Sequence, residues 1–263
     1  MQLEQITYSV NNGIATIQLN QPESLNSFTK IMLGELKQML QAAREDPEVR
    51  VIVLTGSGRA FCAGQSLRER TRKTEEPKPD LGESLKERYS PIAMAIKESP
   101  KPVIAAVNGV AAGAGANIAL ACDLVIAKKS ASFLQAFTRI GLMPDAGGTH
   151  TLTRNAGRQR AMGMTLLAQP VSAEVAESWG LIWRAVEDEK FAEEVTKIAT
   201  QLANGPSLAY AATKRAILAA ESSDFKSTLD LESDLQTDLG FSNDYEEGVL
   251  AFREKRKPNF TGS

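Results

Sequence analysis

The chain has few of the residues that build disulfide frameworks and metal centres: two cysteines and one histidine among 263 residues. Cys62 and Cys122 lie far apart in apolar surroundings, so we expect buried free thiols in a reducing compartment rather than a disulfide-rich secreted domain. With His150 as the single histidine, the sequence predicts no metal cluster and no redox centre.

A strong charge imbalance and long apolar runs are also missing. The 30 basic and 32 acidic residues leave a net charge of −2, which gives no reason to expect nucleic acid or an acidic membrane as a partner. The start MQLEQITYSV has neither a basic region nor a long apolar region, and no apolar run approaches the ~20 residues of a membrane helix. We therefore expect a cytoplasmic protein.

The sequence does contain continuous apolar runs, typical of strands, that alternate with segments whose apolar residues have helical spacing. Residues 6–20 predict a β-hairpin that turns at an Asn-Gly pair, and 29–45 have the apolar spacing of a helix. The continuous apolar runs at 49–58 and 101–109 are typical of strands buried on both faces. Later segments predict, in chain order, a helix at 83–98, a glycine-rich start leading into a helix at 110–123, a strand at 124–135, a helix from about 148, a Ser172-capped helix at 172–180, a short strand at 181–187, and helices from 189 interrupted at 205–206 and 221–226.

This order predicts the α/β class with a mostly parallel core. We expect residues 1–200 to form the core that holds the site. Residues 201–263 are expected to form a helical region that packs on the core or on a neighbouring subunit. The charged, proline-containing segment 69–82 could form a mobile flap, and whether it closes on substrate is left open by the sequence.

Three glycine-bearing stretches, 56–67, 108–120 and 141–149, each follow an apolar run. Loops at the carboxyl ends of parallel strands are where α/β proteins place their sites. The second stretch has Ile118 where a dinucleotide-binding fingerprint needs its third glycine, so nicotinamide binding is not favoured. Small residues also allow two backbone N–H groups to approach one oxygen, which is the arrangement of an oxyanion hole.

Three motifs taken together carry a resemblance to a known family: FCAG at 61–64, KPVIAAVNGVAAGAGANIALACDLVIA at 101–127 and IGLMPDAGGT at 140–149. They resemble the crotonase superfamily, also called the enoyl-CoA hydratase/isomerase family, and LNQPESLNSF and AFREKRKPNF near the two ends fit the same family. The resemblance implies a crotonase-like spiral of ββα turns with a C-terminal helical domain, assembled as homotrimers or as hexamers of two trimers. It implies an acyl-CoA thioester as substrate, with coenzyme A entering as part of the substrate and no separate cofactor.

The resemblance also implies roles for particular residues. The backbone N–H groups of Ala63 and Ala114 are expected to hold the thioester carbonyl. Ser66 replaces an aspartate that is common at its position, which puts the usual side-chain anchoring of that loop in doubt. The positions expected to contact the acyl group or coenzyme A are Leu25, Asn26, Gly64, Gln65, Ser66, Leu67, Gly113, Asn117, Phe137 and, near the phosphates and across a subunit boundary, Lys255.

Departures from the family pattern indicate the reaction. The two glutamates that activate water in the hydratases correspond to Asn117 and Phe137, so hydration is not favoured. Asn117 is expected either to orient substrate or water or to bond locally, and Phe137 to form a wall of the acyl pocket. Asp145 stands where hydratases commonly have glycine. An acid at this position resembles the dienoyl-CoA isomerases and, more closely, the ring-epoxide isomerases of phenylacetate degradation.

Two roles are open for Asp145. It either moves a proton within the acyl group, with its pKa raised by burial beside Phe137 and Met143, or it caps the helix that begins near 148. The first role predicts a CoA-thioester isomerase that converts a ring epoxide of phenylacetyl-CoA to an oxepin. The alternatives are a dienoyl-CoA or 3-enoyl-CoA isomerase, a hydratase and, more remotely, a non-catalytic acyl-CoA-binding protein. A dehalogenase, which also uses an acid here, would need further His and Trp residues lining its site, whereas the single histidine, His150, follows Asp145 at an expected helix start.

Overall fold

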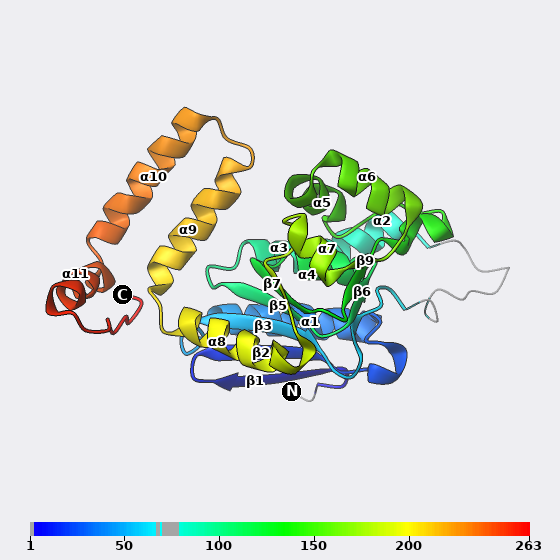
Figure 1. The fold of residues 1–263 in the computed structure, drawn as a ribbon, viewed down its shortest axis with the longest axis horizontal. Helices are drawn as coiled ribbons and strands as arrows, with labels where there is room; N and C mark the ends of the chain where they lie inside the picture. The colour runs from blue at the N-terminus through cyan, green and yellow to red at the C-terminus, as the bar shows by residue number, and fades with distance from the viewer. Residues whose placement is uncertain (1–2, 67–68, 70–78) are drawn as a thin grey trace.

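The computed structural model describes residues 3–66, 69 and 79–263. Leu67 and the greater part of the expected flap at 69–82 lie outside these residues. The described chain is a mixed α/β structure with two sheets of mainly parallel strands and a helical C-terminal region (Figure 1). None of the described helices is long and apolar enough to cross a membrane.

Ten strands form the two sheets among the described residues. The larger sheet has the order β1-β2-β3-β5-β7-β10, and the smaller one has the order β4-β6-β8-β9. Their bounds are β1 Ile6–Asn11, β2 Ile14–Leu19, β3 Val51–Gly56, β4 Ala60–Cys62, β5 Val103–Val107, β6 Val110–Ala112, β7 Leu124–Lys128, β8 Ser132–Leu134, β9 Val171–Ser172 and β10 Arg184–Val186. Only the pairs β1–β2 and β8–β9 are antiparallel, so the expected parallel core is confirmed.

The helices lie between and after the strands. The α-helices are α1 Lys30–Glu45, α2 Leu81–Ser84, α3 Ser90–Lys97, α4 Ala114–Leu120, α5 Gly148–Ala156, α6 Arg158–Leu167, α7 Ala173–Ser178, α8 Phe191–Ala203, α9 Ser207–Ala220, α10 Phe225–Gly240 and α11 Asn243–Glu254. A π-helical turn, η3 (Leu85–Tyr89), joins α2 to α3, and short 3₁₀ turns are η1 Pro22–Ser24, η4 Ala136–Ile140 and η5 Asp188–Lys190.

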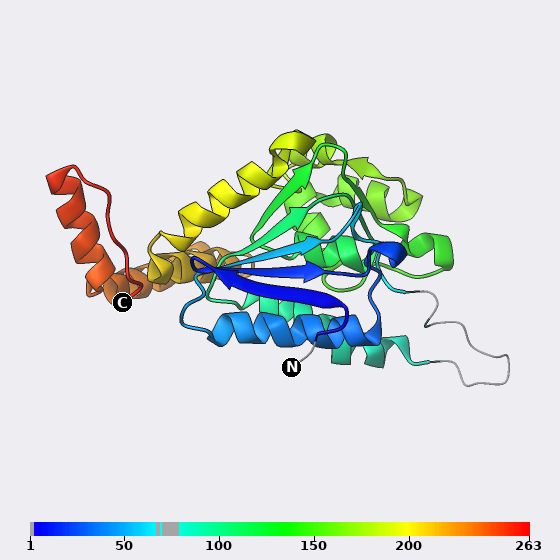
Figure 2. The ribbon, with the colours of Figure 1, turned by 90° about the horizontal axis from the view of Figure 1, so that it is seen from below.

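The larger sheet is covered on both faces, as the continuous apolar run of β3 predicts. Successive side chains of a strand point to opposite faces. Ile52 and Leu54 accordingly pack in the cluster that includes α1, while Val51 and Val53 pack in the cluster that includes α8. Figure 2 shows α1 and α8 on opposite sides of the sheet.

Several local predictions are confirmed and one is wrong. The hairpin turns at Asn12 and Gly13, whose φ values of 51° and 77° are those of a type I′ turn. Ser172 caps α7 by accepting the Val175 N–H at 3.3 Å. The single strand expected over 124–135 is instead two strands, β7 and β8, which belong to different sheets because the chain bends between them.

The C-terminal helices extend away from the sheets (Figures 1 and 2). The expected boundary at residue 200 falls within α8, which packs on the larger sheet through Phe191, Ala199 and Ala203. Beyond it, no residue of α9 or α10 is fully buried in the single chain, although the Lys214 side chain of α9 contacts the core. The division into two domains stays a prediction.

Candidate active site

The candidate site forms at the carboxyl ends of three parallel strands. β4, β6 and β8 are neighbours in the smaller sheet. The segments that follow them begin at Ala63, Gly113 and Gln135, so the register of the sheet brings these three loops to one edge. The first two belong to the glycine-bearing stretches identified in the sequence, and the third precedes Phe137.

Gly64 allows the first loop to approach the second. Its φ of +90° lies in a region that side chains disfavour, and a Cβ built on it would lie 2.8 Å from the Ala112 carbonyl oxygen and 3.6 Å from the Ala114 nitrogen. A residue other than glycine would push the two loops apart. The predicted juxtaposition of these loops is therefore enforced by backbone contact.

The structure corrects the assignment of Ala63 as an oxyanion donor. The Ala63 N–H donates to the Leu25 carbonyl at 2.9 Å, so it is already used within the protein. Phe28 forms a parallel bridge to Gln65. The Phe28 N–H donates to the Gly64 carbonyl at 2.7 Å, and the Phe28 carbonyl accepts the Ser66 N–H at 2.9 Å. In a parallel ladder the residue between two such bonds directs its own N–H the other way. The Gln65 N–H therefore points away from Phe28.

The second donor position is formed where β6 ends. Gly113 is the N-cap of α4 with a φ of 52°, and its own N–H donates to the Leu134 carbonyl at 2.8 Å. Ala114 is the first residue of the helix, and the N–H groups of a first helical turn have no acceptor within their helix. The Phe137 ring lies over this point, 3.7 Å from a Cβ built on Gly113. Phe137 thus stands beside the second donor, where an acyl-pocket wall is expected.

Asp145 lies in a tight loop before α5. Its side chain is half-buried, and its backbone carbonyl accepts the Gly148 N–H at 2.8 Å. The residues between them, Ala146 and Gly147, have φ values of 48° and 80°. The N-cap of α5 is Gly147, so the alternative that Asp145 is the helix cap is wrong.

The surroundings of Asp145 differ in part from those expected. Phe137 is buried, and its ring lies against the Gly113 position. Met143, by contrast, is 67% exposed in the single chain, so it is not part of a buried apolar wall there.

The buried side-chain amide of Asn117 is hydrogen-bonded to the loop that carries Asp145. Asn117 is fully buried, and its Nδ2 donates to the Asp145 carbonyl oxygen at 2.8 Å. Its Oδ1 accepts from Gln135 Nε2, also at 2.8 Å, and Gln135 is equally buried. Of the two roles expected for Asn117, local bonding is the one that its contacts support. Sequence reasoning did not single out Gln135, although a glutamine directly after an apolar strand and before Phe137 was a usable signal.

Leu25 and Asn26 brace the first loop. The Asn26 side chain is fully buried and donates to the Ser57 and Ala60 carbonyls, both at 2.9 Å, while it accepts the Gln21 N–H at 2.9 Å. Its amide is thus used within the protein, so the expectation that it lines the substrate is not supported by its contacts. Leu25 contributes its carbonyl to Ala63.

Tyr89 is a further residue that the sequence did not identify. It is buried on η3, and its hydroxyl donates to Gln65 Oε1. The helical segment 81–97 thereby contacts the same loop that carries the candidate donor. Leu67, expected next in that loop, lies outside the described residues.

Lys255 is not brought to the site within one chain. It is the exposed C-cap of α11, and α11 lies at the far end of the C-terminal region (Figure 2). Its neighbour Arg256 is held by Glu247 at 2.6 and 2.8 Å and by Glu254 at 2.7 Å. The basic tail is therefore partly neutralised by its own helix.

Cys62 is a packing residue. It is fully buried, and burial raises the pKa of its thiol to about 12. A Cβ on Gly115 would lie 2.7 Å from its sulfur, so the thiol fills the contact between β4 and α4. A thiol that stays protonated at neutral pH is a poor nucleophile.

Known proteins resemble this chain over its whole length. The family model for enoyl-CoA hydratase/isomerase matches residues 9–263. The chain is 48% identical over 260 residues to 1,2-epoxyphenylacetyl-CoA isomerase of Escherichia coli K12, with 99% of each protein covered. It is 51% identical over 262 residues to a probable enoyl-CoA hydratase of Rhodobacter capsulatus, with 100% of each covered. A crystal structure of enoyl-CoA hydratase subunit I from Geobacillus kaustophilus superposes with a TM-score of 0.92 at 35% identity, with 100% of both chains covered. The chain therefore belongs to the enoyl-CoA hydratase/isomerase family of enzymes, the crotonase superfamily.

Proposed function

We propose that this protein is an acyl-CoA isomerase in which Asp145 moves a proton within the acyl group. The favoured substrate is a ring epoxide of phenylacetyl-CoA, which would be converted to the seven-membered oxepin. This substrate class is the one named for the relative from Escherichia coli. The proposal requires no net addition or loss of atoms, because an isomerase returns the proton that it removes.

One observation carries the proposal. The two positions that hold the water-activating glutamates in the hydratases are here an amide, Asn117, already committed to two protein hydrogen bonds, and the apolar Phe137. Neither takes or gives a proton at neutral pH. The acid that we assign to proton transfer is Asp145. Support comes from its backbone carbonyl, which accepts a hydrogen bond from the Asn117 side chain, and Asn117 lies three residues after Ala114 on α4.

Polarisation of the thioester carbonyl is the first task. We assign it to the N–H groups of Ala114 and Gln65, because the Ala63 N–H is used by Leu25. Two donors aimed at one oxygen stabilise the negative charge that develops when a carbon next to the carbonyl loses a proton. The loss of one such donor typically costs about 2.7–4 kcal/mol of transition-state stabilisation.

Proton movement is the second task. Asp145 in its ionised form would accept a proton from the activated acyl group, and in its protonated form would return it at another atom. The same parts could move a 3-enoyl double bond to the 2-position, so pocket shape decides between these substrates. No metal or redox group takes part in this scheme, and coenzyme A enters with the substrate.

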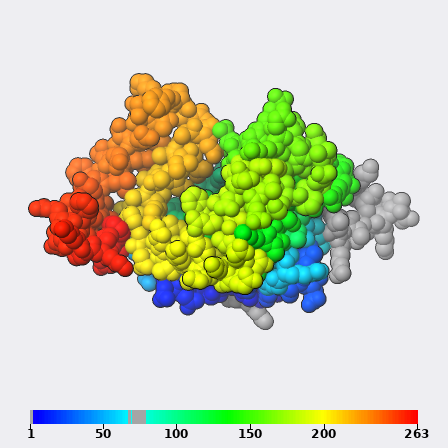
Figure 3. Space-filling model, in the orientation of Figure 1, coloured from blue at the N-terminus to red at the C-terminus, as the bar shows by residue number. Residues whose placement is uncertain are grey.

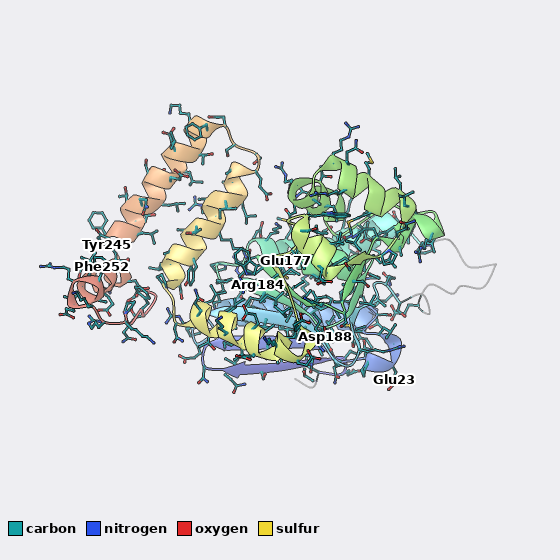
Figure 4. All side chains as sticks on the ribbon, viewed as in Figure 1. Glu23, Glu177, Arg184, Asp188, Tyr245 and Phe252 are labelled. Atoms are coloured by element: carbon teal, nitrogen blue, oxygen red, sulfur yellow. The ribbon has the colours of Figure 1, made fainter. Side chains whose placement is uncertain are left out.

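Assembly is part of the proposal. We propose a homotrimer or a hexamer of two trimers, supported by the unburied C-terminal helices. Figure 4 places Tyr245 and Phe252 on α11, away from the core, and they are 58% and 86% exposed. A hollow of about 850 Å³ separates α9 and α10 from α3 and α5 (Figure 3). Lys255 would reach a site only on a neighbouring subunit. Two buried free thiols support a cytoplasmic location.

The test is a substrate panel with wild type and Asp145→Asn. Isomerisation of the phenylacetyl-CoA ring epoxide and of a 3-enoyl-CoA, and hydration of a 2-enoyl-CoA, are each followed by chromatography of the CoA esters. The proposal predicts isomerisation that Asp145→Asn lowers at least a hundredfold, with binding of a non-reactive acyl-CoA retained. Efficient hydration that survives Asp145→Asn would instead assign the protein to the hydratases, and binding without any conversion would leave only an acyl-CoA-binding role.

A further inference from the structure

The loop that carries Asp145 needs support from outside itself. Ala146 has a φ of 48°, a conformation that costs an alanine more than a glycine, and Gly147 follows it with a φ of 80°. The local bond from Gly148 to the Asp145 carbonyl closes the turn but does not tie it to the rest of the site. A proton-transfer group displaced by even 1 Å can lose up to about a hundredfold in rate.

Asn117 supplies that support. Its Nδ2 donates to the Asp145 carbonyl at 2.8 Å, and its side chain lies so close to the start of α5 that a Cβ on Gly148 would come within 2.3 Å of the same nitrogen. Asn117 stands on α4, three residues after the candidate oxyanion donor Ala114. The amide therefore fixes the Asp145 loop relative to the donor.

Gln135 decides which way the Asn117 amide faces. An amide can turn over and exchange its oxygen and nitrogen, so its orientation is set by its partners. Gln135 Nε2 donates to Asn117 Oδ1 at 2.8 Å, which leaves the Asn117 nitrogen to face the Asp145 carbonyl. With the amide reversed, two oxygens would face each other at Asp145.

The two ends of the Gln135 amide differ in their contacts. Gln135 Oε1 is buried and accepts no hydrogen bond from any described residue. Buried polar atoms are usually satisfied, and an exception calls for an explanation. Here the glutamine is needed for its nitrogen, which is the only end of its amide that the Asn117 oxygen can use.

We infer that Gln135 is a positioning residue for Asp145 and acts through Asn117. The inference rests on the proposed function of Asp145. Gln135→Met removes the buried oxygen of Gln135 but leaves Asn117 Oδ1 without its donor. Removal of the buried oxygen should stabilise the fold, and loss of the donor to Asn117 should destabilise it, so the two effects on stability oppose each other. Only the loss of the donor affects the Asp145 loop. We therefore expect kcat to fall ten- to fiftyfold with KM within threefold and the melting temperature almost unchanged.

Gln135→Glu provides a readout that a merely structural role would not move. The protonated carboxyl can donate to Asn117 Oδ1, whereas the carboxylate cannot, and burial raises the pKa of a carboxyl. The kcat of this variant, divided by that of wild type at the same pH to cancel the titration of Asp145, should rise at least fivefold from pH 8 to pH 5.5. The same ratio for Gln135→Met should stay flat.

Glu35→Gln is the matched control. Glu35 is a buried residue of α1 that accepts the backbone N–H groups of Glu4 and Gln5 at 2.7 and 3.0 Å, and neither of these bonds involves the Asp145 loop. Its substitution should lower the melting temperature and leave kcat unchanged.

The experiment separates the two claims. Wild type and Asp145→Asn are assayed first, with the phenylacetyl-CoA ring epoxide and a 3-enoyl-CoA, and activity independent of Asp145 overturns the proposed function. If Asp145 is required, wild-type kcat in Gln135→Met together with a flat pH ratio in Gln135→Glu overturns the positioning role alone. If Gln135→Met does not fold, the pH ratio of Gln135→Glu decides.

Discussion

At the scale of single residues, the site depends on backbone groups that side chains only arrange. The Ala63 N–H is used by Leu25, and the bridge between Phe28 and Gln65 directs the Gln65 N–H away from Phe28. Asn117 and Gln135 act in the same way on a carbonyl, that of Asp145. The candidate site is therefore built from backbone groups as much as from side chains.

A proline substitution tests the donor. Gln65→Pro removes the backbone N–H proposed to hold the thioester oxygen, whereas Gln65→Ala keeps it and removes only the side-chain contact with Tyr89. We expect kcat/KM to fall about 10²–10³-fold in Gln65→Pro, the usual effect of losing one oxyanion donor, and less than tenfold in Gln65→Ala. Equal losses in the two variants, measured by steady-state kinetics on folded protein, would remove Gln65 from the site.

Thiol chemistry gives a pH test at this scale. Burial raises the pKa of Cys62 to about 12, and burial also raises the pKa of Cys122. Neither thiol should react with a maleimide in the native protein at pH 8, and both should react in denaturant, where the pKa is about 8.5. Because the native thiols hold their protons longer, stability should fall as pH rises above about 8.5. Rapid native labelling at pH 8, detected by mass spectrometry, would contradict the packing role.

At the scale of elements, length decides what the sequence reveals. The sequence predicts β3 correctly because four successive apolar residues are buried on alternate faces of the strand. It predicts α1 correctly from the helical spacing of its apolar residues. β6, β8 and β9 have three residues or fewer, too short to show any periodicity, so the smaller sheet was missed although it carries the site. The orientation of the Ala63 and Gln65 N–H groups depends on pairing with Phe28, a contact 37 residues away that local pattern does not encode.

The link between α9 and the core is one ion pair with further hydrogen bonds. Lys214 Nζ contacts Asp123 Oδ2 and the Ile96 carbonyl, both at 2.8 Å. Burial raises the pKa of Asp123 and lowers that of Lys214, because each charged form is desolvated. The pair is thus maintained by mutual attraction against the cost of burial.

Removal of one partner should be costly. Lys214→Met leaves Asp123 partly buried without its counter-charge, and we expect a loss of about 2–4 kcal/mol in the free energy of unfolding at pH 7. The pKa of Asp123 should rise further in the variant, so the loss should shrink as pH falls and the carboxyl takes up a proton. Lys226→Met, which breaks the exposed pair with Asp230 on α10, is the control and should cost less than about 0.5 kcal/mol. Urea unfolding at pH 7 and pH 5 measures both, and equal effects would contradict the account.

At the scale of the whole molecule, the crotonase fold and the family are those predicted from three motifs. The C-terminal helices present a large apolar surface: Phe225, Phe241 and Phe252 are each more than three-quarters exposed in the single chain. Exposed apolar surface is often a site of contact with another copy or a partner, which is consistent with the proposed assembly. The proposed assembly is linked to the site through Lys255, which would reach a site only on a neighbouring subunit.

Assembly is measured directly by mass in solution. For a chain of 28.4 kDa, the proposal predicts three or six times that mass by sedimentation equilibrium. Leu229→Glu places a charge on the apolar side of α10 and should shift the mass toward the monomer, whereas Lys226→Glu on the same helix should not. A monomer for wild type at micromolar concentration would contradict the assembly and the reach of Lys255 to a neighbouring site.

The central claim is that Asp145 moves a proton of the bound acyl group. Solvent deuterium exchange into phenylacetyl-CoA and a linear acyl-CoA tests it most directly, because exchange reports proton removal even where no product accumulates. The account predicts exchange next to the carbonyl with wild type, loss of at least a hundredfold in Asp145→Asn, and unchanged binding of both CoA esters. Exchange at the same rate in wild type and Asp145→Asn would show that another group carries the proton and would contradict the account.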